Sequence, residues 1–228
     1  MKAVILAAGK GTRMRPLTNT VPKPLLKISG KPILEHNLDA VHGFVNEIII
    51  VIGYLGEQIK NYFGNDFKGI PIKYIEQKEQ LGTGHAIICA EPFLDDKFMI
   101  IVGDDFFAKN VIEKASKHNL CVVASRVTDP ERFGVFELDD DNKLISLEEK
   151  PATPKTNYVN TGLWVMNKQI IELMKKQNLS KRGEFELTDA LKEMMKTNKI
   201  HCETIENGWI AIGYPDDLNK VEKYLNGD

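Results

Sequence analysis

Two glycines, two arginines and two lysines follow the first apolar run of the sequence, within the stretch LAAGKGTRMRPLTNTVPKPL that spans residues 6–25. A glycine-rich turn after a strand lets backbone N–H groups approach phosphate oxygens, because no Cβ blocks the way. Arg13 and Arg15 offer bidentate contacts to an anion, and Lys23 offers a mobile point charge. The stretch therefore predicts an anion site. Its glycine spacing matches neither the dinucleotide-binding fingerprint nor the P-loop.

A second group of chemically capable residues, Asp104 and Asp105, ends the apolar run FMIIVGDD. Carboxylates at the carboxyl end of a strand lie where open α/β sheets bind ligands. Mg²⁺ typically takes one or two carboxylates together with substrate phosphates. An acid pair at this place also serves ordinary turn chemistry, but the nearby anion loop favours a metal.

The elements that must position these residues alternate along the first half of the chain. Continuous apolar runs predict buried strands at 3–8, 47–54, 72–77, 98–105 and 120–127. Amphipathic patterns with glycine or proline at their ends predict helices at 30–43, 55–64 and 83–91. This alternation is typical of βαβ units, which build a parallel sheet covered by helices on both faces.

The second half of the chain has a different pattern. The turn-rich DDDN predicts a hairpin over 134–150. It is followed by predicted strands at 157–167 and 201–206, a helix at 185–196 and a last helix after Pro215. We expect a single domain, 1–228, of the α/β class. Its Rossmann-like sheet is expected to be mixed and mostly parallel, covered by helices, with an added antiparallel portion.

Composition restricts the class of partner. The net charge of −2 argues against a chain-wide basic field for nucleic acid, and the longest apolar runs are too short to cross a bilayer. Cys89, Cys121 and Cys202 show no paired spacing, which argues against a disulfide framework or a cysteine-based zinc site. The N-terminus has no signal-peptide pattern. We expect a cytoplasmic protein that binds neither nucleic acid nor membranes.

Several motifs, in order along the chain, resemble the sugar-1-phosphate nucleotidyltransferase family. GKGTRMRPLT with PKPL downstream is similar to the family signature G-x-G-T-R-[ML]-x-P-x-T, and EQLGTGHA resembles N-acetylglucosamine-1-phosphate uridylyltransferases. RFGVFELDDDNKLISLEEKP, PKTNYVNTGLWV and RGEFELTD resemble glucose-1-phosphate thymidylyltransferases. The resemblance implies an enzyme that converts a nucleoside triphosphate and a sugar 1-phosphate into a nucleotide-sugar and pyrophosphate, with Mg²⁺ as cofactor.

On the nucleotide side, the resemblance implies that the loop 9–13 wraps the triphosphate. Arg13 would stabilise the leaving pyrophosphate, and Lys23 the α-phosphate or the incoming phosphate. Gln77 and Gly82 match base-recognition positions, which favours UTP or dTTP; without the resemblance they indicate only a strand end and a helix start. The implied nucleotide-binding residues are Leu6, Ala8, Gly9, Gly11, Thr12, Arg13, Gln77, Gly82 and Thr83. His85 is expected to pack rather than act as a base.

On the sugar side, the resemblance implies that the antiparallel portion binds the sugar. Glu149 would contact sugar hydroxyls and Lys150 the sugar's phosphate, while Gly134 and Asn160 would contact the sugar. Glucose 1-phosphate is the favoured sugar substrate and N-acetylglucosamine 1-phosphate its rival. The resemblance also implies a homo-oligomer, and the absence of β-helix repeats predicts no acetyltransferase activity.

The metal site departs from the family pattern. The resemblance assigns a metal ligand to Asp104 and leaves Asp105 as a neighbour or turn residue. The family's second ligand is the aspartate of W-x-D-x-G-[TY]-P, but GWIAIGYPDDL has Ala211 there, and alanine cannot coordinate a cation. Asp216 and Asp217 are expected to begin the last helix, where a carboxylate serves the helix N-terminus.

Four explanations of Ala211 stay open: weakened catalysis, a substituted ligand, a regulatory relative that binds nucleotide-sugar without catalysis, or an engineered substitution. A glycosyltransferase that uses GDD as its metal motif is a further alternative. It ranks below these because it has no use for a triphosphate loop.

Overall fold

The structure, a computed structural model, describes residues 1–180 and 182–227. Its strands are β1 (Lys2–Ala7), β2 (Lys27–Ile28), β3 (Lys31–Pro32), β4 (Glu47–Ile52), β5 (Asp66–Phe67), β6 (Ile70–Glu76), β7 (Lys97–Val102), β8 (Phe106–Phe107), β9 (Cys121–Arg126), β10 (Gly134–Leu138), β11 (Leu144–Glu149), β12 (Tyr158–Asn167), β13 (His201–Ile205) and β14 (Trp209–Ile210). Its helices are α1 (Ile33–Val41), α2 (Gly56–Phe63), α3 (Gly82–Ala90), α4 (Lys109–Ser116), α5 (Gln169–Lys175), α6 (Leu187–Met195) and α7 (Asp217–Asn226). The short 3₁₀ turns are η1 (Thr12–Met14), η2 (Leu17–Asn19), η3 (Lys23–Leu25), η4 (Glu91–Phe93) and η5 (Pro130–Arg132).

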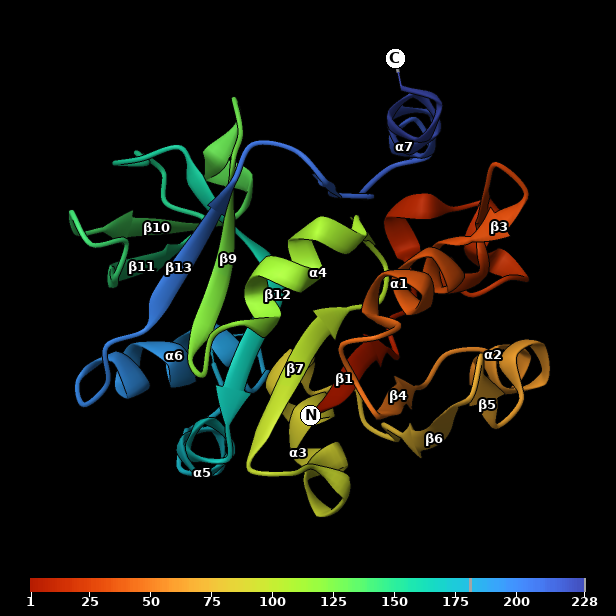
Figure 1. The fold of residues 1–228 in the computed structure, drawn as a ribbon, viewed down its shortest axis with the longest axis horizontal. Helices are drawn as coiled ribbons and strands as arrows, with labels where there is room; N and C mark the ends of the chain where they lie inside the picture. The colour runs from red at the N-terminus through yellow and green to blue at the C-terminus, as the bar shows by residue number, and fades with distance from the viewer. Residues whose placement is uncertain (181, 228) are drawn as a thin grey trace.

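One large mixed sheet forms the centre of the molecule (Figure 1). Its strands follow the order β11-β10-β12-β7-β1-β4-β6-β5, while β9 pairs with β12 and β13 with β9. The pairs β1–β4, β1–β7, β4–β6 and β9–β13 are parallel. The strand β12 is antiparallel to β7, β9 and β10, and β10 forms the predicted hairpin with β11. The expected α/β, Rossmann-like fold with an antiparallel portion is confirmed.

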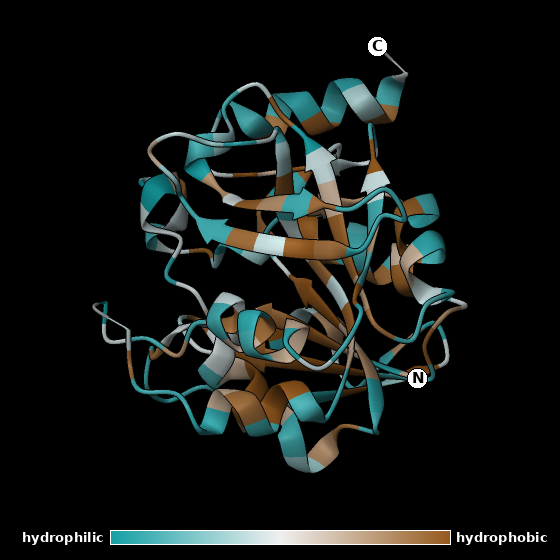
Figure 2. Ribbon diagram, turned by 90° about the vertical axis from the view of Figure 1, so that its left-hand side faces the viewer, coloured by the Kyte–Doolittle hydropathy of each residue, from teal (hydrophilic) through white to brown (hydrophobic). Residues whose placement is uncertain are grey.

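Helices cover both faces of this sheet, which explains the continuous apolar runs of its central strands. Alternate residues of β1 enter two different cores: Ile5 packs toward α1, α2 and α4, and Val4 packs toward α3, α5 and α6. Figure 2 shows the apolar strands inside and many hydrophilic positions on the outer helices.

Two helices, α4 and α5, were not predicted from the sequence. Each has about two turns, and each buries only three apolar side chains. So short a segment contains too few repeats to show a helical period, and its stability comes from tertiary packing. In the structure α4 packs against α1, and α5 packs between α3 and α6.

A third apolar cluster joins the two ends of the sequence. Met14 and Ile33, from the segment after β1, pack with Ile212 and with Val221 of α7. The backbone N–H of Ser29 also donates to Glu222 of α7 at 3.1 Å. The loop that follows β1 is therefore supported by the last helix.

Two expectations from composition can be compared with the structure. Cys89, Cys121 and Cys202 are free thiols in the structure. None of the helices formed by residues 1–180 and 182–227 has both the length and the hydrophobicity to cross a membrane.

Candidate active site

Two adjoining cavities lie at the carboxyl ends of β1 and β7, where open α/β sheets bind ligands. Their volumes are about 430 and 490 Å³. Both are lined by Arg13, Lys23, Val102 and Asp104, so the charged residues predicted for catalysis form the boundary between them. Such an arrangement lets two separate ligands meet at one charged wall.

The loop after β1 forms one side of the first cavity. The hydroxyl of Thr18 donates to the carbonyl of Gly11 at 2.8 Å, and a Cβ added at Gly11 would lie 3.1 Å from the Cβ of Lys23. Glycine therefore lets this backbone pass close to the lysine. Of the predicted nucleotide-binding residues, those that line the cavity are Leu6, Ala8, Gly9, Gly11, Arg13, Gln77, Gly82 and Thr83. Thr12 is not among them; it is exposed in η1 and does not line the cavity.

Gln77 is held in place at the far side of the first cavity. Its side chain is buried, and its Nε2 donates to the carbonyl of Gly82 at 2.9 Å and lies 3.2 Å from Nδ1 of His85. The His85 ring stacks on Phe185 with 6.3 Å between centroids. His85 thus packs beside Gln77, in line with the packing role expected of it.

The backbone of Gly82 is both left-handed and crowded, which makes a first prediction. Its φ is +88°, and an added Cβ would lie 2.8 Å from the Cβ of Glu184. Gly69 offers a matched control, because its φ is +85° and an added Cβ would meet nothing within 4 Å. We expect Gly69→Ala to cost about 1 kcal/mol of unfolding free energy for the left-handed backbone alone.

Gly82→Ala should cost about 1–3 kcal/mol more than this control, because the crowded Cβ also displaces the Glu184 segment. Urea unfolding of both variants measures the difference. If both variants lost the same unfolding free energy, the Glu184 segment would have moved away from the added Cβ without a measurable energetic penalty.

Lys23 and Asp104 form an ion pair in the wall shared by the cavities. The Nζ of Lys23 donates to Oδ2 of Asp104 at 2.7 Å. The lysine side chain is only 6% exposed, whereas that of Asp104 is 43% exposed. An ammonium group buried this deeply requires a partner charge, and Asp104 supplies it from the open side.

Two other acids near this wall are bound to the backbone of the 209–217 segment. Asp105 accepts hydrogen bonds from the N–H of Ile212 at 2.9 Å and from Nε1 of Trp209 at 3.3 Å. Burial, with the charge of Asp104 beside it, raises the pKa of Asp105 to about 7. Asp217 begins α7, as predicted. Its Oδ2 accepts from the N–H groups of residues 213 and 214 at 2.9 Å each.

The predicted sugar-side residues come together in the second cavity, which Gly134, Glu149, Lys150 and Asn160 all line. Gly134 lies opposite Glu149 in the β10–β11 hairpin, and an added Cβ there would be 3.1 Å from the Glu149 carboxylate. Asn160 is oriented by its Oδ1, which accepts from Trp164 Nε1 at 2.8 Å. The hairpin and β12 thus form one wall.

Several cavity residues were missed from the sequence. The first cavity adds Gln80, whose Nε2 donates to the carbonyl of Ala8 at 3.0 Å, and Glu184. The second cavity adds the cations Arg126, Arg132 and Lys220. Arg126 and Lys220 lie in no motif, so no spacing in the sequence predicted them. Gln80, Glu184 and Arg132 stand within motifs that resemble the family, but the resemblance assigned no role to them.

The shared wall offers one open carboxylate as a ligand for Mg²⁺. Ala211 lines the second cavity without a donor atom, and the carboxylates of Asp105 and Asp217 are bound to backbone N–H groups. Asp104 remains, half open to the cavities. One carboxylate, phosphate oxygens and water make a usual Mg²⁺ environment, so the residues present fit this ion.

Comparisons with known sequences cover nearly the whole chain. A family model described as nucleotidyl transferase matches residues 2–227. The chain is 43% identical to the bifunctional protein GlmU of Methanocaldococcus jannaschii over 225 residues, which are 99% of this chain and 54% of that protein. It thus spans about half the length of that relative. It is also 33% identical to the UTP–glucose-1-phosphate uridylyltransferase AglF of Haloferax volcanii, covering 99% of this chain and 96% of AglF.

Solved structures share the fold. A Bacillus anthracis protein assigned as a glucose-1-phosphate thymidylyltransferase, solved with sucrose, superposes with a TM-score of 0.89 at 27% identity. The alignment covers 98% of this chain and 94% of that one. A UDP-glucose pyrophosphorylase solved with UDP-glucose gives a TM-score of 0.88 at 23% identity, covering 99% and 98% of the two chains.

Proposed function

Since the chain belongs to the sugar-1-phosphate nucleotidyltransferase family, we propose that it joins a nucleoside triphosphate to a sugar 1-phosphate and releases pyrophosphate. The observation that carries this proposal is the pair of cavities that share Arg13, Lys23 and Asp104. UTP or dTTP and glucose 1-phosphate are the favoured substrates, and N-acetylglucosamine 1-phosphate is the rival sugar. The names of the Haloferax and Bacillus relatives support glucose 1-phosphate.

The proposed reaction needs positioning and charge more than proton transfer. An oxygen of the sugar phosphate attacks the α-phosphorus in line, and the bond from that phosphorus to the pyrophosphate oxygen breaks as the new bond forms. The phosphate nucleophile is already ionised, so the chain supplies no base. Arg13 stabilises the leaving pyrophosphate and Lys23 stabilises the α-phosphate, both by charge-assisted hydrogen bonds.

Each cavity takes one substrate in this proposal. The first holds the nucleotide, with Gln77 and the backbone at Gly82 against the base and loop 9–13 around the triphosphate. The second holds the sugar phosphate, with Glu149 on sugar hydroxyls and Lys150 on the phosphate, and with Gly134 and Asn160 against the sugar ring. Asp104 holds Mg²⁺, which supplies positive charge to the phosphates when bound.

The proposal extends to three general properties. Residues 1–228 act as one nucleotidyltransferase domain, of which Lys181 and Asp228 lie outside the described residues. The three free thiols support a reducing compartment such as the cytoplasm. A homo-oligomer remains an expectation from the family resemblance.

The test is pyrophosphate release with Mg²⁺, measured with UTP, dTTP, CTP, GTP and ATP against a panel of sugar 1-phosphates. We expect turnover with a pyrimidine nucleotide and glucose 1-phosphate. The alternative function is a nucleotide-sugar-binding relative without catalysis, motivated by Ala211. It predicts nucleotide-sugar binding by calorimetry and no pyrophosphate release under any of these conditions.

Ala211→Asp distinguishes the two functions further. A carboxylate at this place adds a second oxygen donor beside the cavities, so the Mg²⁺ concentration for half-maximal activity should fall by about tenfold. Ala152→Asp, at an exposed position that lines neither cavity, is the control. Turnover that appears only in Ala211→Asp would mean that the site is complete except for one ligand. If neither the unaltered chain nor Ala211→Asp released pyrophosphate, the enzyme proposal would be overturned.

A further inference from the structure

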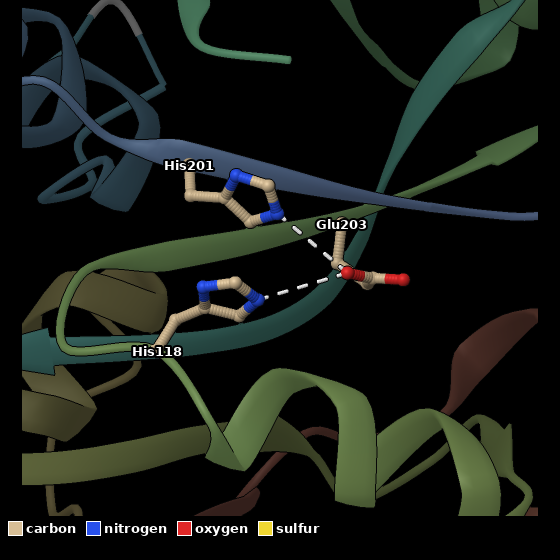
Figure 3. A group of neighbouring side chains, drawn as sticks. All are labelled: His118, His201 and Glu203. Carbon is tan, nitrogen blue, oxygen red and sulfur yellow. Dashed lines mark ion pairs between the residues drawn. The ribbon is translucent and has the colours of Figure 1, made fainter. Parts of the chain in front are cut away.

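Three side chains outside the cavities form a compact group of metal-binding donors (Figure 3). The Nε2 of His118 lies 3.7 Å from Oε2 of Glu203, and the Nε2 of His201 lies 3.6 Å from the same oxygen. All three donor atoms lie within 4.8 Å of one another. We propose that His118, His201 and Glu203 bind a divalent first-row transition-metal ion such as Zn²⁺.

The backbone brings these residues together from two parts of the chain. His201 and Glu203 are two residues apart on β13, so their side chains share one face of the strand. β13 runs parallel to β9, with His201 opposite Cys121. His118 lies in the turn between α4 and β9, where its N–H donates to the carbonyl of Ala115 at 3.2 Å. The donors are therefore supported by a helix end and two paired strands.

The donor types select the ion. Two imidazoles and one carboxylate suit Zn²⁺ and its first-row neighbours, whereas Mg²⁺ prefers oxygen ligands alone. Ligands of tetrahedral Zn²⁺ at about 2.0–2.1 Å lie about 3.3 Å apart, so the three donor atoms, now within 4.8 Å of one another, would move closer together and the stacked imidazole rings would turn toward the ion. Water would occupy the fourth position, since all three side chains are partly exposed.

Charges around the cluster act in both directions. The two imidazole rings stack with 4.0 Å between centroids, so both lie on the same side of Glu203. The ammonium of Lys114 on α4 lies 3.1 Å from Oε1 of Glu203, so it anchors the carboxylate through the oxygen that does not face the histidines. The positive charges of Lys114 and the nearby Lys143 repel a bound metal cation, so they lower the affinity of the cluster for the ion.

The cluster is separate from the proposed active site. His201 lies opposite Cys121 at the amino end of β9, whereas Ser125 and Arg126 at its carboxyl end line the second cavity. Four strand residues, roughly 13 Å, separate the levels of His201 and Ser125. Glu203 lies opposite Val123, two strand residues or roughly 7 Å from the level of Ser125. A bound ion would therefore join the α4–β9 turn to the edge strand β13 rather than touch the substrates. The inference does not depend on the proposed reaction.

Calorimetric titration of the full chain with Zn²⁺, in excess Mg²⁺ to occupy oxygen-only sites, tests the proposal. We expect one Zn²⁺ per chain and a higher midpoint of thermal unfolding with Zn²⁺ present. His118→Gln, His201→Gln and Glu203→Gln should each weaken this binding by at least about 100-fold, because each removes a direct ligand. His42→Gln, at a half-buried histidine elsewhere, should bind Zn²⁺ like the unaltered chain.

Co²⁺ absorption identifies the ligands, since Cys121 and Cys202 lie in the strands beside the cluster. Visible bands of a nitrogen- and oxygen-ligated Co²⁺ are expected, without a thiolate charge-transfer band. A thiolate band, the lack of saturable Zn²⁺ binding, or unchanged binding in a correctly folded His201→Gln chain would each overturn the proposal. Circular dichroism establishes the folding of each variant, and pyrophosphate release is scored separately.

Discussion

Lys23→Met is expected to lower kcat for pyrophosphate release by about 100- to 1,000-fold, the usual cost of removing one transition-state charge contact. Lys23 is buried in the wall between both cavities, where its ammonium is desolvated and acts at short range. Methionine keeps most of the apolar stem and removes the charge, so packing changes little. Steady-state kinetics with the best substrate pair from the panel measure the effect.

The matched control for this lysine is Lys27→Met. Lys27 is exposed in β2 and lines neither cavity, so its loss should leave kcat within a factor of two or three of the unaltered chain. If the Lys23→Met chain retained nearly full kcat, Lys23 would have no role in the proposed mechanism. The proposed overall function would not be affected by that result.

Asp104→Asn is expected to have an effect of similar size, and one that added Mg²⁺ does not reverse. Because Ala211 has no side-chain donor, Asp104 is the carboxylate that we propose for the metal, and an amide there should remove most of the protein's hold on the ion. We expect a loss of activity of about 100-fold or more and a rise in the Mg²⁺ concentration needed for half-maximal activity. A Mg²⁺ titration of initial rates measures both.

Asp95→Asn is the control, because Asp95 lies on the surface beside Lys2, away from both cavities. The double variant Lys23→Met with Asp104→Asn adds a further check. Since the two side chains are in direct contact at 2.7 Å, their effects on unfolding free energy should not add. If Asp104→Asn kept its activity and its Mg²⁺ dependence, the metal would have to be held elsewhere.

The central strands could be predicted from the sequence because burial on both faces leaves an uninterrupted apolar run. Ile48, Ile49 and Ile50 are all fully buried, which is why EIIIVI shows no alternation. The order of the strands in the sheet could not be predicted from the sequence. The insertion of β12 antiparallel to β7 depends on contacts between distant segments, and nothing in its own residues specifies a neighbour.

The residues of the candidate site also differ in how far the sequence could predict them. Glycines, Lys23 and the acid pair lie in ordered motifs, so their positions could be assigned from sequence and resemblance. Arg126 and Lys220 are single charges outside any motif, and only the folded chain brings them to the second cavity. Thr12 shows the reverse case, since it stands within a motif yet lies outside the lining of either cavity.

The packing of α7 against the segment after β1 also has a consequence for how the protein is made. The segment after β1 leaves the ribosome well before α7, but its apolar residues Met14 and Ile33 are covered by Ile212 and Val221 (Figure 1). The nascent segment therefore lacks this support until α7 has been synthesised. Contacts of such long sequence separation form slowly, so the part of the cavity wall that this segment builds is completed late.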